Sequence, residues 1–251
     1  FSRFATVNSR RLIAFWIEML MQPRSSLTAG EKRMLQMFQF TVWQKTFEEC
    51  GFACLLDGIS EVRKNPTLCA ELLELLQYNF DRIDFIDERV DLGFDCPLDL
   101  HCNYTRDQIL VALDFLKPST VLEGVKYLPD QKIDIAFVTL NKSDKDYSPS
   151  TMYQDYSVGE EFFHWQSQST TSENSPTGQR YIHHREKGAL FLLFVRENKT
   201  DRISGGAGVY TFLGKANYVQ HEGSRPMSIL WKLERPIPAR LQKKTNELIG
   251  G

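Results

Sequence analysis

The spacing of apolar residues changes near residue 121, and this change constrains the fold more than any other feature of the chain. Before it, apolar residues recur every three or four positions, as they do on a helix that buries one face. After it, they form short runs bounded by Gly, Pro or Asp, a pattern typical of strands. We therefore predict an α+β fold, with a helical domain over residues 1–120 and a β domain over residues 121–251.

Three helical patterns lie in the first 120 residues, and they cover residues 11–21, 30–49 and 65–78. Gly51 follows the second pattern in the position of a C-cap, and Pro66 lies in the first turn of the third. A further helix begins after Thr105, which forms a capping box with Gln108. Because strands follow that helix, it suits either a winged-helix element or a plain linker, and the sequence leaves both interpretations open.

Five strands are predicted in the second half, and they cover residues 124–128, 133–140, 189–196, 210–221 and 227–233. This number of strands within about 120 residues favours a compact β-barrel or a strongly bent sheet. We expect the barrel. The segment between residues 198 and 208 is rich in Gly and predicts a hairpin or loop.

The composition is that of a soluble globular protein, with 42% hydrophobic and 25% charged residues. No apolar run approaches the roughly 20 residues of a membrane span. Five cysteines, an odd number with no CxxC pair, predict reduced thiols in a cytoplasmic protein. The chain begins with Phe1 rather than Met, and we expect it to be a piece of a longer protein.

The motifs of several enzyme classes are missing from the sequence. It contains no Gly-x-x-x-x-Gly-Lys-Ser/Thr loop for phosphates and no Gly-x-Ser-x-Gly nucleophile elbow. His183 and His184 have no acidic or cysteine partner at the spacing of a metal site. We therefore expect no catalytic centre, no metal and no cofactor in this chain.

The segment from Phe162 to Tyr181 crowds aromatic rings, amides and hydroxyls together with almost no aliphatic residues. A buried strand is not expected to look like this, because each buried polar group without a partner costs about 1–3 kcal/mol. A surface loop seldom carries Phe, Phe, His and Trp in succession. Rings for stacking beside amides for reading an edge are what a pocket for a flat polar ring needs.

Thirteen residues follow as candidates for contact with DNA. Stacking, or a cage around a methyl group, is predicted for Tyr153, Tyr156, Phe162 and Trp165. Reading of base edges is predicted for Asp155, Gln166 and Gln168. Contact with the DNA backbone is predicted for Arg180, His221, Ser224 and Arg225, and Ser167 and Tyr181 complete the set. For any one of these residues a core or turn role fits as well, but the cluster favours a site.

Two expectations about this site can be checked. Replacing Trp165 with Ala should weaken binding and leave the fold intact. Residues 126–251 contain 17 Lys and Arg against 14 Asp and Glu, a net charge of +3 that is compatible with contact to nucleic acid. A solvated surface without a partner explains that charge nearly as well.

The same region resembles a known family. The runs FVTLNKSDKDYSPSTMYQDY (137–156), FHWQSQSTTSENSPTGQRYIHH (163–184), LLFVRE (192–197) and YTFLGKANYVQHEGSRPMSILWKLERPIP (210–238) look like the C-terminal domain of bacterial superfamily-2 helicases that carry a phospholipase-D-like nuclease. The resemblance covers residues 126–238. It implies an SRA-like barrel of the PUA superfamily, and the helical stretch resembles the segment that couples the motor to this reader.

The resemblance further implies a function and partners. Relatives recognise modified cytosine in double-stranded DNA, chiefly 5-methylcytosine, and license cleavage by an ATP-dependent type IV restriction enzyme used in phage defence. We expect this chain to flip out such a base, with 5-hydroxymethylcytosine as a further ligand. It would act beside helicase and nuclease domains of the parent protein, which would use ATP and Mg.

Two other classes of function stay open. The chain can instead be an interaction module that docks the motor or a partner protein without base recognition. It can also be an enzyme that acts alone, although the missing motifs argue against this. If the chain reads DNA, its affinity for DNA should fall steeply with added salt. The affinity of an interaction module for a protein partner need not do so.

Overall fold

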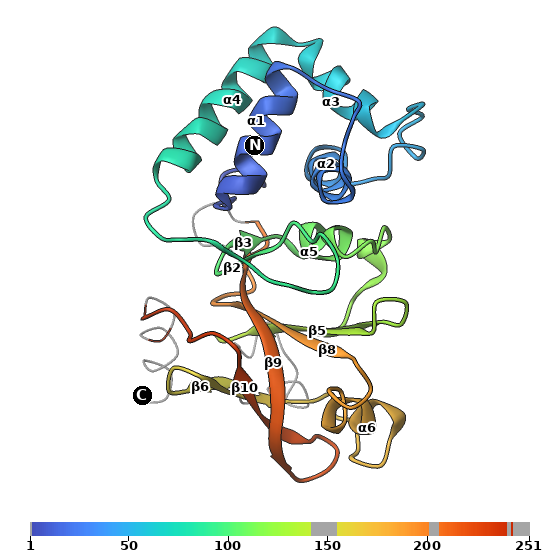
Figure 1. Ribbon diagram of the computed structural model, residues 1–251, viewed down its shortest axis with the longest axis vertical. Coiled ribbons are helices and arrows are strands. Elements are labelled where there is room, and N and C mark those ends of the chain that lie inside the picture. The colour runs from blue at the N-terminus through green and yellow to red at the C-terminus, as the bar shows by residue number, and fades with distance from the viewer. Residues whose placement is uncertain (1, 142–154, 201–205, 240–241, 243–251) are drawn as a thin grey trace. The chain divides into compact units, whose positions relative to one another are not determined.

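The computed structural model describes residues 2–141, 155–200, 206–239 and 242. The chain divides into two compact units, Phe1–Leu122 and Glu123–Gly251 (Figure 1). No helix of the described residues is long and apolar enough to cross a membrane. Each unit is described by itself.

Five α-helices build the first unit, and they are α1 (Arg10–Met21), α2 (Ala29–Val42), α3 (Leu55–Arg63), α4 (Pro66–Asp81) and α5 (Arg106–Ala112). A 3-10 turn (Pro118–Thr120) and three short strands, β1 (Glu88–Arg89), β2 (Asp99–Leu100) and β3 (Asn103–Tyr104), complete it. The capping box of Thr105 and Gln108 is confirmed at the start of α5, which packs against α2.

The predicted helix over 30–49 is wrong at its C-terminal end, because α2 stops at Val42. Trp43 caps it, and Gln44 adopts a left-handed φ of 58°, which no helix can continue. The turn that follows leads into α3, which the sequence pattern did not indicate. The core of this unit includes Trp16, whose ring contacts Phe4 and Phe38 at centroid distances of 5.5 and 5.7 Å.

Over the residues of the second unit that the structure describes, the chain forms seven strands and one helix. The strands are β4 (Val125–Leu128), β5 (Ile133–Thr139), β6 (Tyr156–Val158), β7 (Phe162–Gln166), β8 (Leu190–Arg196), β9 (Tyr210–Glu222) and β10 (Ser228–Leu233), and the helix is α6 (Pro176–Ile182). The five predicted strands are confirmed as β4, β5, β8, β9 and β10. Hydrogen bonding gives the order β4-β5-β8-β9-β10-β7-β6. Only the β5–β8 pair within this order is parallel.

The predicted closed barrel is wrong for the part of the chain that the structure describes. The strand order runs from β4 at one edge to β6 at the other, and no pairing joins these two strands. The long strand β9, orange in Figure 1, belongs to both halves of the sheet and pairs with β8 on one side and β10 on the other. The fold is a mixed α and β unit with a mostly antiparallel, bent sheet.

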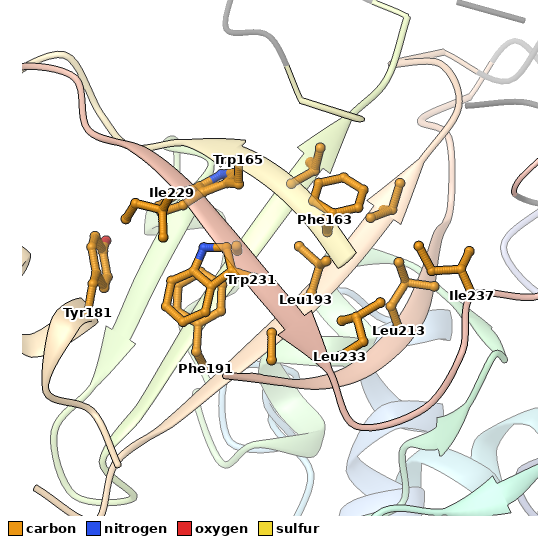
Figure 2. Close-up of a cluster of buried hydrophobic side chains, with 14 of the residues drawn as sticks. Phe163, Trp165, Tyr181, Phe191, Leu193, Leu213, Ile229, Trp231, Leu233 and Ile237 are labelled. Atoms are coloured by element: carbon orange, nitrogen blue, oxygen red, sulfur yellow. The ribbon is translucent and has the colours of Figure 1, made fainter. Parts of the chain in front are cut away.

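An aromatic core brings together side chains from both halves of this sheet. Figure 2 shows Trp231 of β10 lying over Phe191 of β8, with Trp165 and Tyr181 beside them. The Phe191 and Trp231 rings stack at a centroid distance of 3.8 Å. Tyr181 meets Trp165 edge to face at 5.5 Å. Stacked and edge-to-face aromatic pairs contribute about 0.5–1.5 kcal/mol beyond their buried area, so this cluster holds both halves of the sheet together.

Candidate nucleic-acid interface

The segment Phe162–Gln166 is a strand, which corrects the expectation that so polar a run would not form one. Phe163 and Trp165 are buried, while Phe162, His164 and Gln166 are half-buried on the other face. Side chains of a strand alternate between its two faces, so the polar residues never enter the core. The mixed composition is therefore that of a strand with one buried face and one partly exposed face.

Trp165 and Tyr181 are core residues in this structure, which corrects their predicted place in an open pocket. Their exposed fractions are 4% and 1%, and each contacts Phe191 and Trp231. Both rings already pack against aromatic partners in the core, so neither offers a face to an incoming base. Burial also raises the pKa of Tyr181.

Two loops meet at one end of this unit, and we name residues 167–175 and 223–227 the loop pair. Ser167 joins them twice: its N–H donates to the carbonyl of Met227 at 2.9 Å, and its hydroxyl accepts the N–H of Met227 at 2.9 Å. The N–H of Arg225 donates to the carbonyl of Thr171 at 3.1 Å. The structure thus brings together the predicted residues of both loops, although Ser167 itself is buried and structural.

The side chains of the loop pair differ in exposure. Ser224 and Arg225 are exposed at the tip of the β9–β10 hairpin. Gln168 is half-buried, and its Oε1 accepts hydrogen bonds from Thr171 Oγ1 at 3.2 Å and from the Tyr181 hydroxyl at 3.4 Å. Gln168 therefore links the aromatic core to the loop above it, and the hydroxyl and guanidinium of the hairpin face solvent.

His221 ties β9 to the loop pair. Its Nδ1 lies 2.7 Å from the Tyr218 hydroxyl, and its Nε2 lies 3.2 Å from a carboxylate oxygen of Glu173. Nε2 can donate to this carboxylate, and Nδ1 shares the second hydrogen bond with the hydroxyl. Partial burial, and then the charge of Glu173, raise the pKa of Tyr218. His221 is therefore engaged within the protein, which does not suit the predicted direct contact with a phosphate.

His184 contacts the backbone of Tyr218, and the sequence alone did not single it out as a site residue. The backbone N–H of Tyr218 donates to its Nε2 at 3.1 Å, so this nitrogen carries no proton. Its Nδ1 lies 3.3 Å from the carbonyl of Ala189 and must be the protonated one. Burial lowers the pKa of His184, which keeps this imidazole neutral.

The outer face of β6 and β7 gathers more of the predicted residues. Tyr156 and His164 are directly paired across the two strands, and their rings stack at 4.7 Å. A carboxylate oxygen of Asp155 accepts the backbone N–H of Gln166 at 2.9 Å, and the Gln166 amide donates to Ser228 at 3.2 Å. Phe162 lies at the other end of β7, 5.8 Å from the ammonium group of Lys232.

Arg180 lies apart from the loop pair and is already paired. Its Nε and Nη2 donate to the two carboxylate oxygens of Asp134 at 2.6 and 2.8 Å. The guanidinium also stacks on the ring of Tyr127, 3.8 Å from its centroid. Asp134 is 4% exposed, and this burial raises its pKa while Arg180 offsets part of the rise. We correct the predicted backbone contact of Arg180 to a buried ion pair that fastens α6 to β5.

The remaining candidate, Tyr153, lies outside the described residues. The residues that sequence reasoning missed are Asp134 and His184. An acidic residue within the otherwise apolar strand Ile133–Thr139 was the available signal for Asp134. Among the described residues, no three His, Cys, Asp or Glu side chains are grouped so as to hold a metal ion.

Comparison with known families places the chain. Residues 98–244 match a family model described as a domain of unknown function, DUF3427. The chain belongs to this family. The matched region contains all of the strands of the second unit, the loop pair and the aromatic core.

Other comparisons add little to the family. A crystal structure of SUVH6 from Arabidopsis thaliana in complex with SAM aligns with 13% sequence identity and a TM-score of 0.32. The alignment covers 95% of this chain and 40% of that one. A likeness at that TM-score carries no argument about fold or function. None of the curated proteins matches the chain.

Proposed function

We propose that this chain is a non-catalytic DNA-binding module that recognises modified cytosine by flipping it out of the duplex. The observation that carries the proposal is the loop pair. Two segments some fifty residues apart in sequence are fastened to each other, and they present hydroxyl, amide and guanidinium groups to solvent above a rigid aromatic core. Such groups on a fixed support are what contacts to phosphates and base edges require.

Some residues keep the role that the sequence predicted, and others change it. Ser224 and Arg225 contact the DNA backbone from the tip of the hairpin. Tyr156 and His164 form the stacking surface on the outer face, while Trp165 and Tyr181 support β7 and the loop pair from below. Stacking on one aromatic ring contributes about 1–3 kcal/mol per base, which helps to offset the cost of extruding it.

The wider assignment rests on sequence resemblance. The matched family is described as a domain of unknown function, so a place beside a helicase motor is proposed from the sequence resemblance alone. We infer that the chain is the specificity module of an ATP-dependent type IV restriction enzyme in the cytoplasm, whose helicase and nuclease domains use ATP and Mg. This chain itself holds neither cofactor in the proposal, and its ligand is 5-methylcytosine or 5-hydroxymethylcytosine in double-stranded DNA.

A side-by-side titration tests this function. Fluorescence anisotropy compares duplexes of one sequence that carry cytosine, 5-methylcytosine or 5-hydroxymethylcytosine, each at 50 and 200 mM salt. We expect tighter binding to a modified duplex and a steep loss of affinity with salt. Equal, salt-independent binding to the three duplexes, or no binding, would contradict the proposal and favour a module that docks a protein partner.

Two variants separate the proposed contacts. Arg225→Gln should weaken all three duplexes by the same factor and lower the salt slope by about one phosphate contact. Tyr156→Ala should reduce the preference for the modified base. Lys64→Gln, which removes an exposed charge from the helical unit, is the matched control and should change neither quantity.

A further inference from the structure

A groove of about 290 Å³ opens on the second unit, and none of the residues that the sequence singled out for binding lines it. The turn between α6 and β8 forms one wall, with Arg185 and Gly188, and β9 forms the other, with Lys215 and Asn217. Glu234 lies at its edge. A volume at the lower end of small-molecule sites fits one small group rather than a whole nucleotide.

Two of the polar groups in this groove are not engaged within the protein. Arg185 is exposed and Asn217 is half-buried. Over the described part of the chain, neither side chain makes a hydrogen bond or an ion pair. Lys215, in contrast, pairs with Glu234 at 2.9 Å. The groove therefore holds a guanidinium and an amide that can donate hydrogen bonds, with an ammonium group beside them.

The charges that line the groove favour a singly charged anion. Arg185 and Lys215 contribute two positive charges and Glu234 one negative charge. His184 adds none, because burial lowers its pKa and its Nε2 accepts the N–H of Tyr218. The formal net charge of +1 matches a phosphodiester, which carries one negative charge. It is a poorer match for a phosphate monoester, which carries nearly two at neutral pH.

The groove and the loop pair both involve β9. Asn217 lines the groove, and His221 lies 3.2 Å from Glu173 of the loop pair. The pairing of β9 with β10 skips Val219, so a β-bulge separates Asn217 from His221. A group bound in the groove and a group bound at the loop pair would therefore occupy separate places on the second unit.

We propose that this groove binds a phosphodiester of the DNA backbone through Arg185, Lys215 and Asn217, and that Glu234 limits its affinity. The inference rests on the proposed function and adds a second contact to it. Arginine offers two parallel N–H donors to phosphate oxygens, and lysine adds a point charge. The contact carries no sequence information and fixes the position of the duplex on the protein.

The test is the salt dependence of DNA binding by the full chain and three variants. Arg185→Gln and Lys215→Gln should each weaken binding about 2- to 5-fold, the range for one exposed charge pair. Arg185→Gln should also lower the slope of log K against log salt by about one. Each variant should lose the same factor of affinity for modified and unmodified duplexes, because a contact to the DNA backbone does not read the base.

Glu234→Gln is the decisive variant, because it should change the affinity for DNA in the opposite direction. It raises the formal charge of the groove from +1 to +2, so binding to both duplexes should become tighter by a similar factor. A merely structural role of the Lys215–Glu234 pair predicts weaker binding and a lower unfolding temperature instead. Lys64→Gln again serves as the control for loss of one exposed charge.

The outcomes separate the two proposals. If the wild-type chain binds DNA but the groove variants behave like Lys64→Gln, the groove proposal is wrong and the proposed function stands. If the wild-type chain binds no duplex, both are wrong. If Glu234→Gln strengthens binding to an oligoglutamate peptide and leaves DNA binding unchanged, the groove serves an acidic protein segment, and the phosphodiester assignment is overturned.

Discussion

The two faces of β7 carry similar kinds of side chain but differ in their surroundings. On the inner face, Phe163 and Trp165 are enclosed by the aromatic core. On the outer face, Phe162, His164 and Gln166 are only half-buried and meet partners from β6 and β10. Aromatic character by itself therefore does not identify a binding residue. Whether an aromatic residue of β7 is available for binding depends on which face of the strand its side chain lies on.

The largest expected effect comes from truncating one residue on each face of β7 and comparing the two losses of stability. Trp165→Ala should lower the free energy of unfolding by about 3–5 kcal/mol, because it removes a large ring from a packed core. This corrects the expectation that the change would leave the fold intact. His164→Ala should cost less than about 1 kcal/mol. Urea denaturation followed by circular dichroism measures both, and equal losses would show that the two faces do not differ in this way.

The buried ion pair of α6 offers the next largest effect. Arg180→Met should cost about 3 kcal/mol, because it leaves the carboxylate of Asp134 buried without its cation. Adding Asp134→Asn should recover part of this loss, since the second change removes the stranded charge. If the double variant Arg180→Met/Asp134→Asn is less stable than Arg180→Met alone, the ion pair between Arg180 and Asp134 does not stabilise the fold in this way.

The packing of α6 under the loop pair provides a smaller effect. A Cβ atom on Gly178 would overlap the carbonyl oxygen of Ser172, so Gly178→Ala should displace the loop and cost about 1–3 kcal/mol. DNA binding should weaken at the same time. Thr177→Ala, one residue earlier in the helix, is the matched control, and a Gly178→Ala variant with unchanged stability and binding would contradict this account.

The smallest expected effect is a dependence on pH. The pKa of His184 is lowered by burial, so between that value and about 6.5 the unfolded chain binds a proton that the folded chain does not. The free energy of unfolding should therefore fall as pH drops below 6.5, by at most about 1.4 kcal/mol per pH unit from this residue. Denaturation at pH 7.5, 6.5 and 5.5 measures it. His184→Asn should lack this contribution, and identical pH profiles would rule it out.

Sequence patterns predicted the elements whose signals are local. The capping box of Thr105 with Gln108 and the Pro in the first turn of α4 depend on neighbouring residues, and both are found. The change of period near residue 121 lies beside the division of the chain at residue 122. Patterns failed where the local signal was weak: Ser175 caps α6 and Pro176 begins it, and no helix was predicted there.

The sequence by itself determined that aromatic and polar side chains would gather in residues 155–181 and that strands would dominate the second half. Only the tertiary structure decided which of them face solvent. Trp165 is in the core because β10 and β8 supply its partners, and Arg180 is neutralised by Asp134, 46 residues earlier. Such pairings depend on strand register and on chain segments far apart in sequence, which the spacing of residues within one segment does not encode.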